Sequence, residues 1–342
     1  MKPHFTLSKS KLLEQVKTLE DLNLKISYSY KTNREVGKLL QEIAPQIDFS
    51  IHAKEEIEEI EDKSKISFFT QAESIEELKE TLETGIKNFV VDNEVDLTRI
   101  LETIKQTETK INLSIRMKFQ EHRVGTGKYF VYGLPSIKVN EIIQEIKDNP
   151  LIDKLGIHLH RKSQNTSEWE IIEEVEDSLT KETLERIDMI NLGGGLPSTY
   201  RSSNVDVFEY IFQKLTKAQK FLEEKNIKTI IEPGRFLSAP PIELVTEIIQ
   251  AYDNNLIINT TIYNCALDNS LTNTKMLVEG ETENGEAFLI KGNSPTRDDI
   301  FRYRVKLNNP KVGDTITFLN AGAYNYTTDF FGYKKLETKI TE

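Results

Sequence analysis

Short apolar runs with strand-like alternation are separated by longer helical patterns from residue 25 to about residue 235. In the first run, Ile26, Tyr28 and Tyr30 fall at every second position, which predicts one face of a β-strand. Eight strands are predicted in all, over Ile26–Tyr30, Ile47–Ile51, Ile66–Phe69, Phe89–Val91, Ile111–Phe119, Leu155–His160, Met189–Leu192 and Thr229–Ile231.

Helical patterns fill the intervals between these strands. Asn33 can cap a helix over Arg34–Ile43, and Ser74-Ile-Glu-Glu77 is a capping box. The segment Leu7–Val16 looks like a helix that leads into the first strand. Eight strands that alternate with helices predict a TIM-like (β/α)8 barrel over residues 1–238, with a doubly wound open sheet as the alternative.

The alternation of strand and helix patterns ends after about residue 236. Pro240-Pro241 interrupts the chain, Ile242–Tyr252 opens a series of extended segments, and no long helical pattern separates them. Residues 239–342 are therefore predicted to form a C-terminal all-β domain, with further strands at Ala287–Ile290, Phe301–Leu307 and Thr315–Phe318.

Composition narrows the function classes. The formal net charge of -11 argues against nucleic acid or an anionic membrane as the main partner. Cys265 is the only cysteine, so the chain has no intrachain disulfide framework and no cysteine cluster for zinc. The sequence shows neither an apolar signal segment at its start nor an apolar run that could span a bilayer, and a cytoplasmic protein is expected.

Candidate chemistry lies at the carboxyl ends of the predicted strands, where barrel enzymes carry their active sites. Lys31 ends the first strand, Gly193–Gly195 follow the seventh, and Glu232-Pro-Gly-Arg235 ends the eighth. The loops after strands seven and eight often hold phosphate in barrels, and glycines let backbone N–H groups approach an anion. His158 and His160 lie two apart on the sixth strand, without a convincing third ligand for zinc, and no metal is expected.

A buried carboxylate beside a bound phosphate needs a cationic partner, and a protonated pyridine nitrogen is one. Lysine, phosphate loops, histidine and Glu232 together fit pyridoxal 5′-phosphate. At these residues the chain resembles the fold-type III pyridoxal-phosphate enzymes, which have the alanine racemase-like fold, in the branch of ornithine, diaminopimelate and arginine decarboxylases. The motifs that carry the resemblance are Tyr30-Lys31-Thr-Asn33, Thr126-Gly-Lys128, His160 with Ser163-Gln164, Gly193–Gly195, Glu232-Pro-Gly-Arg235, Gly322-Ala-Tyr324 and Phe330-Phe-Gly-Tyr333.

The resemblance implies a role for each matching residue. Lys31 is similar to the lysine that forms the Schiff base with the cofactor, His160 to the histidine that stacks on its ring, and Glu232 to the partner of the pyridine nitrogen. Asp48 and Arg116 are similar to residues that line the site. The implied phosphate contacts are Ser163, Gly193, Gly194, Gly195, Gly234, Arg235 and Tyr324.

The implied function is decarboxylation of an amino acid such as ornithine, lysine or diaminopimelate, or of a modified amino acid, in polyamine or lysine biosynthesis. The alternatives are a racemase of the same fold, which places an arginine where this chain has Glu232, and a non-catalytic pyridoxal-phosphate-binding protein, which usually lacks the second domain. The implied assembly is a homodimer in which each β-domain contributes to the partner's active site.

One run departs from the resemblance. If Asp299 matches the last aspartate of the family's Cys-acid-x-x-Asp box, Pro295 replaces the cysteine that returns a proton to the α-carbon, and Thr296 replaces the acid that holds a distal amine. Asp298 and Asp268 are the alternatives for that acid, whereas Arg297 would favour a distal carboxylate or a modified side chain.

Overall fold

The computed structural model describes residues 1–118, 132–203, 207–325, 328 and 332–342. Eight parallel strands close into a barrel, because β9 pairs with β2 through Lys25↔Ile230 and Ile26↔Ile231. The predicted barrel is thus confirmed, and the open-sheet alternative is wrong. Its strands are β2 (Lys25–Ser29), β3 (Asp48–Ile51), β4 (Ile66–Phe69), β5 (Asn88–Val91), β6 (Ile111–Arg116), β7 (Ile152–His158), β8 (Met189–Asn191) and β9 (Lys228–Ile231).

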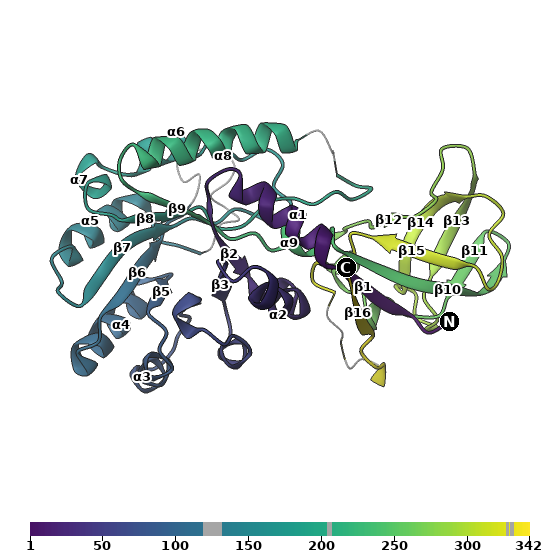
Figure 1. Cartoon of the computed structure of the whole chain (residues 1–342), viewed down its shortest axis with the longest axis horizontal. Coiled ribbons are helices and arrows are strands. Elements are labelled where there is room, and N and C mark those ends of the chain that lie inside the picture. Colours follow the sequence, from purple (N-terminus) through teal and green to yellow (C-terminus); the bar gives the residue numbers. More distant parts are fainter. Residues whose placement is uncertain (119–131, 204–206, 326–327, 329–331) are drawn as a thin grey trace.

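Helices surround this barrel at one end of the molecule (Figure 1). The Asn33 side chain accepts a hydrogen bond from the Val36 backbone and caps α2, and the capping box of Ser74 and Glu77 is present at α3, so both predicted helix starts are confirmed. The helices of the barrel are α1 (Lys9–Glu20), α2 (Arg34–Ile43), α3 (Ile75–Glu83), α4 (Glu94–Thr107), α5 (Ser136–Ile146), α6 (Ile171–Ser178), α7 (Lys181–Leu184), α8 (Phe208–Glu223) and α9 (Arg235–Ser238).

The other end of the molecule is a β-sheet domain (Figure 1). Its strands run in the order β12-β15-β10-β11-β13-β14, and β1 adds to β10 and to β16. The sheet confirms the predicted all-β domain. Its elements are β1 (His4–Ser8), β10 (Ile242–Tyr252), β11 (Asn255–Ile258), α10 (Asp268–Thr272), β12 (Leu277–Val278), β13 (Glu286–Lys291), β14 (Ile300–Leu307), β15 (Thr315–Leu319) and β16 (Glu337–Thr341).

The first residues of the chain differ from the prediction. A helix was expected from Leu7, within a barrel domain that began at residue 1, but His4–Ser8 form β1 of the β-domain. This strand pairs antiparallel with β10 and parallel with β16. Its side chains alternate between half-buried and buried, which is the period of a strand. The helix α1 then starts at Lys9, where the Ser8 side chain caps it.

The two domains are joined next to Lys31. The Asn33 side chain donates to the Gly322 carbonyl oxygen at 2.7 Å, and the Tyr324 backbone N–H donates to the Thr32 carbonyl oxygen at 2.9 Å. The segment that follows β2 is therefore fixed against the β-domain loop that carries Tyr324.

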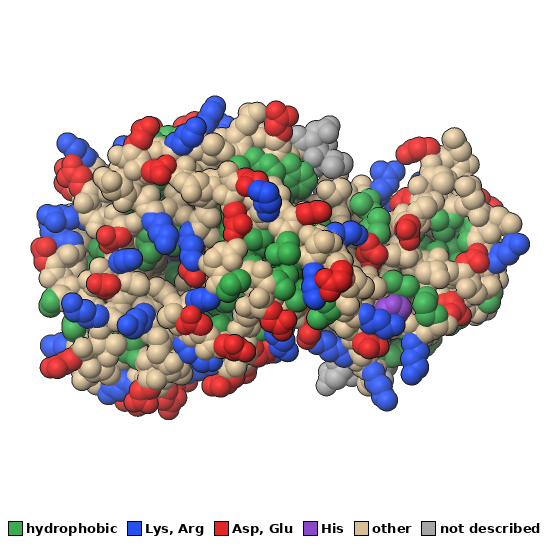
Figure 2. All heavy atoms as spheres, viewed as in Figure 1, with side chains coloured by type: hydrophobic (Ala, Val, Ile, Leu, Met, Phe, Trp, Pro, Cys, Tyr) green, Lys and Arg blue, Asp and Glu red, His purple; other side chains and the backbone are tan. Residues whose placement is uncertain are grey.

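Basic and acidic side chains are interspersed over both domains on the face shown in Figure 2. Among the described residues, no helix is both long enough and apolar enough to cross a membrane.

Candidate active site

A cavity of about 400 Å³ opens at the carboxyl ends of the barrel strands. Residues at or just after the ends of all eight strands line it, and Tyr324 of the β-domain completes the wall. Eleven of the residues that the sequence singled out lie together here: Lys31, Arg116, His158, His160, Ser163, Gly194, Gly195, Glu232, Gly234, Arg235 and Tyr324. Gly193 is not among the residues that line the cavity.

Lys31 lies in a turn of 3-10 helix over Tyr30–Thr32, directly after β2, so the strand begins and ends one residue earlier than predicted. Burial lowers the pKa of Lys31, and the charge of Arg116 adds to this shift, whereas Glu232 and Glu56 oppose it. A lysine whose ammonium form is destabilised offers a larger fraction of free amine, which is the form that attacks a carbonyl.

Glu232 is 4% exposed, and neutral groups hold its carboxylate. Its Oε1 accepts hydrogen bonds from Ser50 Oγ at 2.6 Å and from Asn191 Nδ2 at 2.9 Å. Its Oε2 lies 3.0 Å from His158 Nε2. Burial alone would raise the pKa of Glu232, but His158, Ser50 and His52 outweigh it and bring the pKa to about 2. Glu232 is therefore ionised at neutral pH.

His158 is the donor in its contact with Glu232. Burial lowers the pKa of His158, so its imidazole is neutral at neutral pH and carries one N–H. Its Nδ1 is buried and has no hydrogen-bond partner among the described residues, which places the proton on Nε2. Oε1 of Glu232 thus has two donors and Oε2 has one, which leaves an acceptor position on Oε2. No lysine or arginine of the described residues forms an ion pair with this carboxylate.

The backbone of the glycine loop after β8 can approach a ligand closely, because its glycines have no side chains. Gly193 has φ +67° and Gly195 has φ +103°, a backbone region that other residues rarely adopt. A Cβ on Gly194 would lie 3.0 Å from the Glu232 carbonyl oxygen, and one on Gly234 would lie 2.3 Å from Thr32 Oγ1. Both loops therefore keep their backbone bare at the cavity wall, as an anion site formed by backbone N–H groups requires.

Arg235 occupies the same corner of the cavity and is 3% exposed. Its Nη1 lies 2.8 Å from Oδ2 of Asp268 and donates to Tyr200 Oη at 3.0 Å. Its Nε donates to Ser163 Oγ at 3.3 Å. Burial opposes the charge, but Tyr200 and Asp268 raise the pKa of Arg235 further above its usual value.

Arg116 and His160 complete the predicted wall. Arg116 ends β6 and pairs with Asp92 at 3.2 Å. His160 follows β7, and its ring lies parallel to that of His158, with 6.4 Å between the ring centroids. Burial lowers the pKa of His160 to about 3, with smaller contributions from Arg116 and His158. His160 therefore presents a neutral flat ring to the cavity.

The structure does not bring Asp48 to the cavity. Asp48 begins β3, so it lies at the opposite end of the barrel, where it pairs with Lys25 at 2.8 Å. The cavity residue that follows β3 is His52, which the sequence analysis missed. Its ring stacks on Phe69, with centroids 4.6 Å apart, and burial together with the charge of Lys31 lowers the pKa of His52 to about 3. The end of this strand could have pointed to His52. Because β3 ends at Ile51, the side chain that follows it lies at the opening of the cavity.

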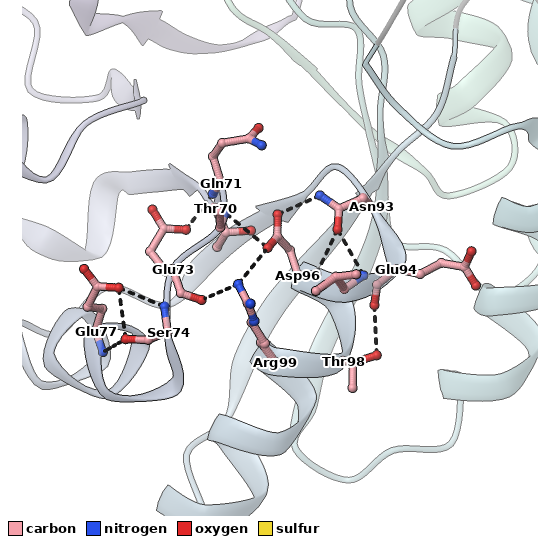
Figure 3. Close-up of polar contacts among 12 residues, drawn as sticks. Thr70, Gln71, Glu73, Ser74, Glu77, Asn93, Glu94, Asp96, Thr98 and Arg99 are labelled. Atoms are coloured by element: carbon pink, nitrogen blue, oxygen red, sulfur yellow. Dashed lines mark hydrogen bonds and ion pairs between the residues drawn. The ribbon is translucent and has the colours of Figure 1, made fainter.

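The loop after β4 adds Gln71 to the cavity wall, and side chains of α4 stabilise this loop (Figure 3). Asp96 accepts hydrogen bonds from the Ala72 backbone at 3.2 Å and from Asn93 Nδ2 at 2.7 Å. Arg99 donates to the Glu73 carbonyl oxygen at 3.1 Å. In Figure 3 the Gln71 side chain points away from these contacts.

The run Gly292–Phe301 does not contribute to the cavity of its own chain. Asp299 is buried and accepts hydrogen bonds from the Ile262 backbone at 2.9 Å and from Ser294 Oγ at 2.6 Å. Arg297 is exposed and pairs with Asp298 at 3.0 Å. The motif Thr126-Gly-Lys128 and the first two residues of Phe330-Phe-Gly-Tyr333 lie outside the described residues.

The family model "Pyridoxal-dependent decarboxylase, pyridoxal binding domain" matches residues 9–239. The chain belongs to this family. It is similar to the diaminopimelate decarboxylase of Methanocaldococcus jannaschii, at 25% identity, and the match covers 87% of this chain and 74% of that protein. It is also similar to the ornithine decarboxylase of Caenorhabditis elegans, at 29% identity, and the match covers 44% of this chain and 40% of that protein.

Solved structures show the same fold. Lysine decarboxylase from Selenomonas ruminantium superimposes with a TM-score of 0.85 at 18% identity, covering 100% of this chain and 93% of that chain. The arginine decarboxylase of Paramecium bursaria Chlorella virus gives a TM-score of 0.79 at 19% identity, covering 100% of this chain and 96% of that one. The resemblance drawn from the motifs is confirmed, and pyridoxal phosphate is the cofactor of this decarboxylase family.

Proposed function

We propose that this decarboxylase removes the α-carboxylate of an amino acid at the cavity of the barrel, with Lys31 as the covalent attachment point of pyridoxal phosphate. The observation that carries this proposal is the charge state of Glu232. This carboxylate is buried and ionised, has no lysine or arginine in an ion pair among the described residues, and keeps an acceptor position on Oε2. A protonated pyridine nitrogen would supply the missing cation.

The bound cofactor supplies an electron sink for the pair left when the bond to the carboxylate breaks. Glu232 would keep the proton on the ring nitrogen, because it lines the cavity, is ionised, and receives a single hydrogen bond at Oε2 from the described residues. Ser50, Asn191 and His158 would keep Glu232 ionised and fixed in direction. A racemase is the weaker alternative, because the resemblance implies an arginine at this position in racemases.

The other cavity residues would hold the remaining parts of the cofactor. The neutral ring of His160 offers a surface for stacking. The implied phosphate corner combines the Gly193–Gly195 loop, of which Gly194 and Gly195 line the cavity, with Gly234, Ser163 and Tyr324. Lys31 lies on the same wall and has a lowered pKa, which prepares its amine for attack on the cofactor's aldehyde.

The substrate is proposed to be a basic amino acid or a modified form of one. The relatives named above are decarboxylases of diaminopimelate, ornithine, lysine and arginine. Within the described cavity, Asp92 is paired with Arg116, and Asp268 behind it is paired with Arg235. Neither acid is left to bind a distal amine, which favours a substrate whose distal amine is acylated or carboxylated.

A homodimer is part of the proposal, since the exposed Arg297 would then reach the cavity of a second copy. Light scattering gives the oligomeric state. Mixing a Lys31→Ala chain with an Arg297→Ala chain should restore part of the activity if one site combines residues of two copies. A fully active monomer would contradict the shared site.

The deciding experiment is to follow carbon dioxide release from a panel of amino acids, including ornithine, lysine, arginine, meso-diaminopimelate and their acylated and carboxylated forms. Wild-type protein should release carbon dioxide, and borohydride reduction should fix the cofactor on the Lys31 peptide, as seen by mass spectrometry. Lys31→Ala should lose both signals. Epimerised substrate without carbon dioxide would support the racemase instead, and a cofactor fixed on another lysine would overturn the assignment of Lys31.

A further inference from the structure

We propose that Ser27 is a positioning residue that acts on Glu232 through Ser50, by a chain of hydroxyl groups across the interior of the barrel. The inference rests on the proposed function, because that function assigns Glu232 to the ring nitrogen of the cofactor. Neither Ser27 nor Ser50 lines the cavity, so Ser27 can influence the reaction only through other residues.

The barrel interior just beneath the cavity carries small residues where barrels usually carry bulky branched ones. On five strands, β2, β3, β4, β6 and β7, a small residue lies two positions before a residue of the cavity wall. Side chains two positions apart on a strand face the same side, so these small residues face the barrel axis. The five residues are Ser27, Ser50, Ser67, Ser114 and Gly156. Hydroxyl groups of different strands can therefore meet inside the barrel.

The hydrogen bonds of Ser50 fix the direction of the chain. Ser50 Oγ lies 2.6 Å from Glu232 Oε1 and 2.7 Å from Ser27 Oγ. A hydroxyl group has one proton, and an ionised carboxylate can only accept, so the proton of Ser50 points to Glu232. The hydrogen bond between the two serines must then be donated by Ser27. Both serines are buried, with exposures of 1% and 0%, so bulk water does not compete for either contact.

A donor to Ser50 strengthens the contact between Ser50 and Glu232. In a buried chain each hydrogen bond polarises the next, so the O–H group of Ser50 becomes a better donor when its oxygen accepts from Ser27. The chain ends on Oε1, whereas the open acceptor position of Glu232 is on Oε2. Ser27 thus stabilises the ionised carboxylate without occupying the oxygen that is assigned to the cofactor.

The apoprotein provides a test that needs no cofactor. Ser27→Ala removes only the hydroxyl group, and a role through Glu232 makes its effect depend on pH. The ionised carboxylate contributes stability above its ordinary pKa of 4.5, and this stability is lost as the pH falls towards 2. The folding equilibrium constant of Ser27→Ala should be about fivefold below that of wild type at pH 7, the size of one hydrogen bond, and the difference should shrink below pH 4.5. Urea titrations from pH 7 to pH 3 measure it, and a loss that is the same at every pH would overturn the proposal.

Ser50→Ala separates a role through Ser50 from a direct one. In the Ser50→Ala background the chain is already broken, so the further change Ser27→Ala should cause no additional pH-dependent loss. Equal pH-dependent losses in both backgrounds would contradict the chain. If Ser27→Ala does not fold, Ser27→Cys takes its place, because a thiol is a weak donor, and the same pH dependence is expected from it.

Ser67→Ala is the matched control. Ser67 is the β4 neighbour of Ser50 in the strand ladder and belongs to the same layer of the interior. Among the described residues, its hydroxyl group forms no hydrogen bond with Ser50 or Glu232. Ser67→Ala should therefore leave kcat and the pH dependence of stability as in wild type. A pH-dependent loss equal to that of Ser27→Ala would show that any hydroxyl group of this layer has the effect, which would rule out a specific role of Ser27.

The loaded enzyme gives a second readout. Because the chain supports the charge of Glu232, Ser27→Ala should lower kcat about fivefold with KM within about twofold of wild type, and Ser27→Thr, which keeps the hydroxyl group, should recover most of the loss. A kcat equal to that of wild type would overturn the role in the reaction. If the wild-type protein does not bind pyridoxal phosphate at Lys31, the proposed function fails, whereas the apoprotein still shows whether Ser27 acts on Glu232.

Discussion

Two charged side chains lie three residues apart at the end of β9, and the protein treats them in opposite ways. Glu232 accepts hydrogen bonds from the neutral donors Ser50, Asn191 and His158. Its carboxylate is ionised and has no lysine or arginine partner among the described residues. Arg235 is paired with Asp268, so its charge has a partner within the protein. The difference teaches that burial and a formal charge do not by themselves identify a ligand contact. The partner of each charge decides whether it is available.

The largest expected effect is that of Glu232→Gln. Glutamine fills nearly the same space but cannot keep the proton on the ring nitrogen, so kcat should fall at least about 100-fold, the usual size for losing one preorganised electrostatic contact. The amount of cofactor fixed on Lys31 should stay near that of the wild type, as measured by mass spectrometry after borohydride reduction. A variant with wild-type kcat would show that the free charge at this end of the cavity has no catalytic use.

His158→Phe should lower the activity less than Glu232→Gln does. It removes the one donor to Oε2 of Glu232, and supporting contacts of this kind are typically worth about 10-fold in activity. His158→Gln, which keeps a donor, should recover part of the loss. In a Glu232→Gln background the change at position 158 should cost little, because its partner is already altered. Equal losses in both backgrounds would contradict a role exercised through Glu232.

These residues also show how far the sequence alone leads. The alternating runs predicted the barrel and the all-β domain, because period-two patterns between capped helices are local signals. The end of the second predicted strand at Ile51 agrees with β3, but the resemblance named Asp48 at the start of this strand, and His52 just after its end was missed. The pairing of Arg235 with Asp268 depends on how two domains are placed, which no local pattern encodes.

Acid offers a third test of the contrast between the two charges. The pKa of Glu232 is lowered from its ordinary value of 4.5 to about 2, so its charge contributes stability above pH 4.5 that is lost as the pH falls towards 2. The difference in the free energy of unfolding between wild type and Glu232→Gln should therefore be constant from pH 7 to 5 and shrink below pH 4.5. Arg235, whose pKa is raised, stays charged throughout. Urea titrations at several pH values measure both trends, and a difference that grows on acidification would contradict the lowered pKa.

The smallest expected effect belongs to Asp48→Asn. Asp48 pairs with Lys25 at the amino end of the barrel, on the side away from the cavity. Partly exposed ion pairs contribute little, so the free energy of unfolding should change by less than about 1 kcal/mol and kcat should not change. His52→Ala, at the carboxyl end of the same strand, is the matched comparison and should alter kcat or KM. A loss of activity in Asp48→Asn alone would mean that the two ends of the barrel are coupled.

The position of β1 has a consequence for how the protein is made. This strand leaves the ribosome before the barrel, and its partners β10 and β16 are translated more than two hundred and more than three hundred residues later. The whole barrel is synthesised between β1 and these partners, so it can fold before the sheet of the β-domain is complete. We expect a nascent chain cut before β16 to leave β1 with one open edge, and a β-domain expressed alone from residue 239 to lack β1. The sheet can thus close around β1 only after the barrel has been synthesised.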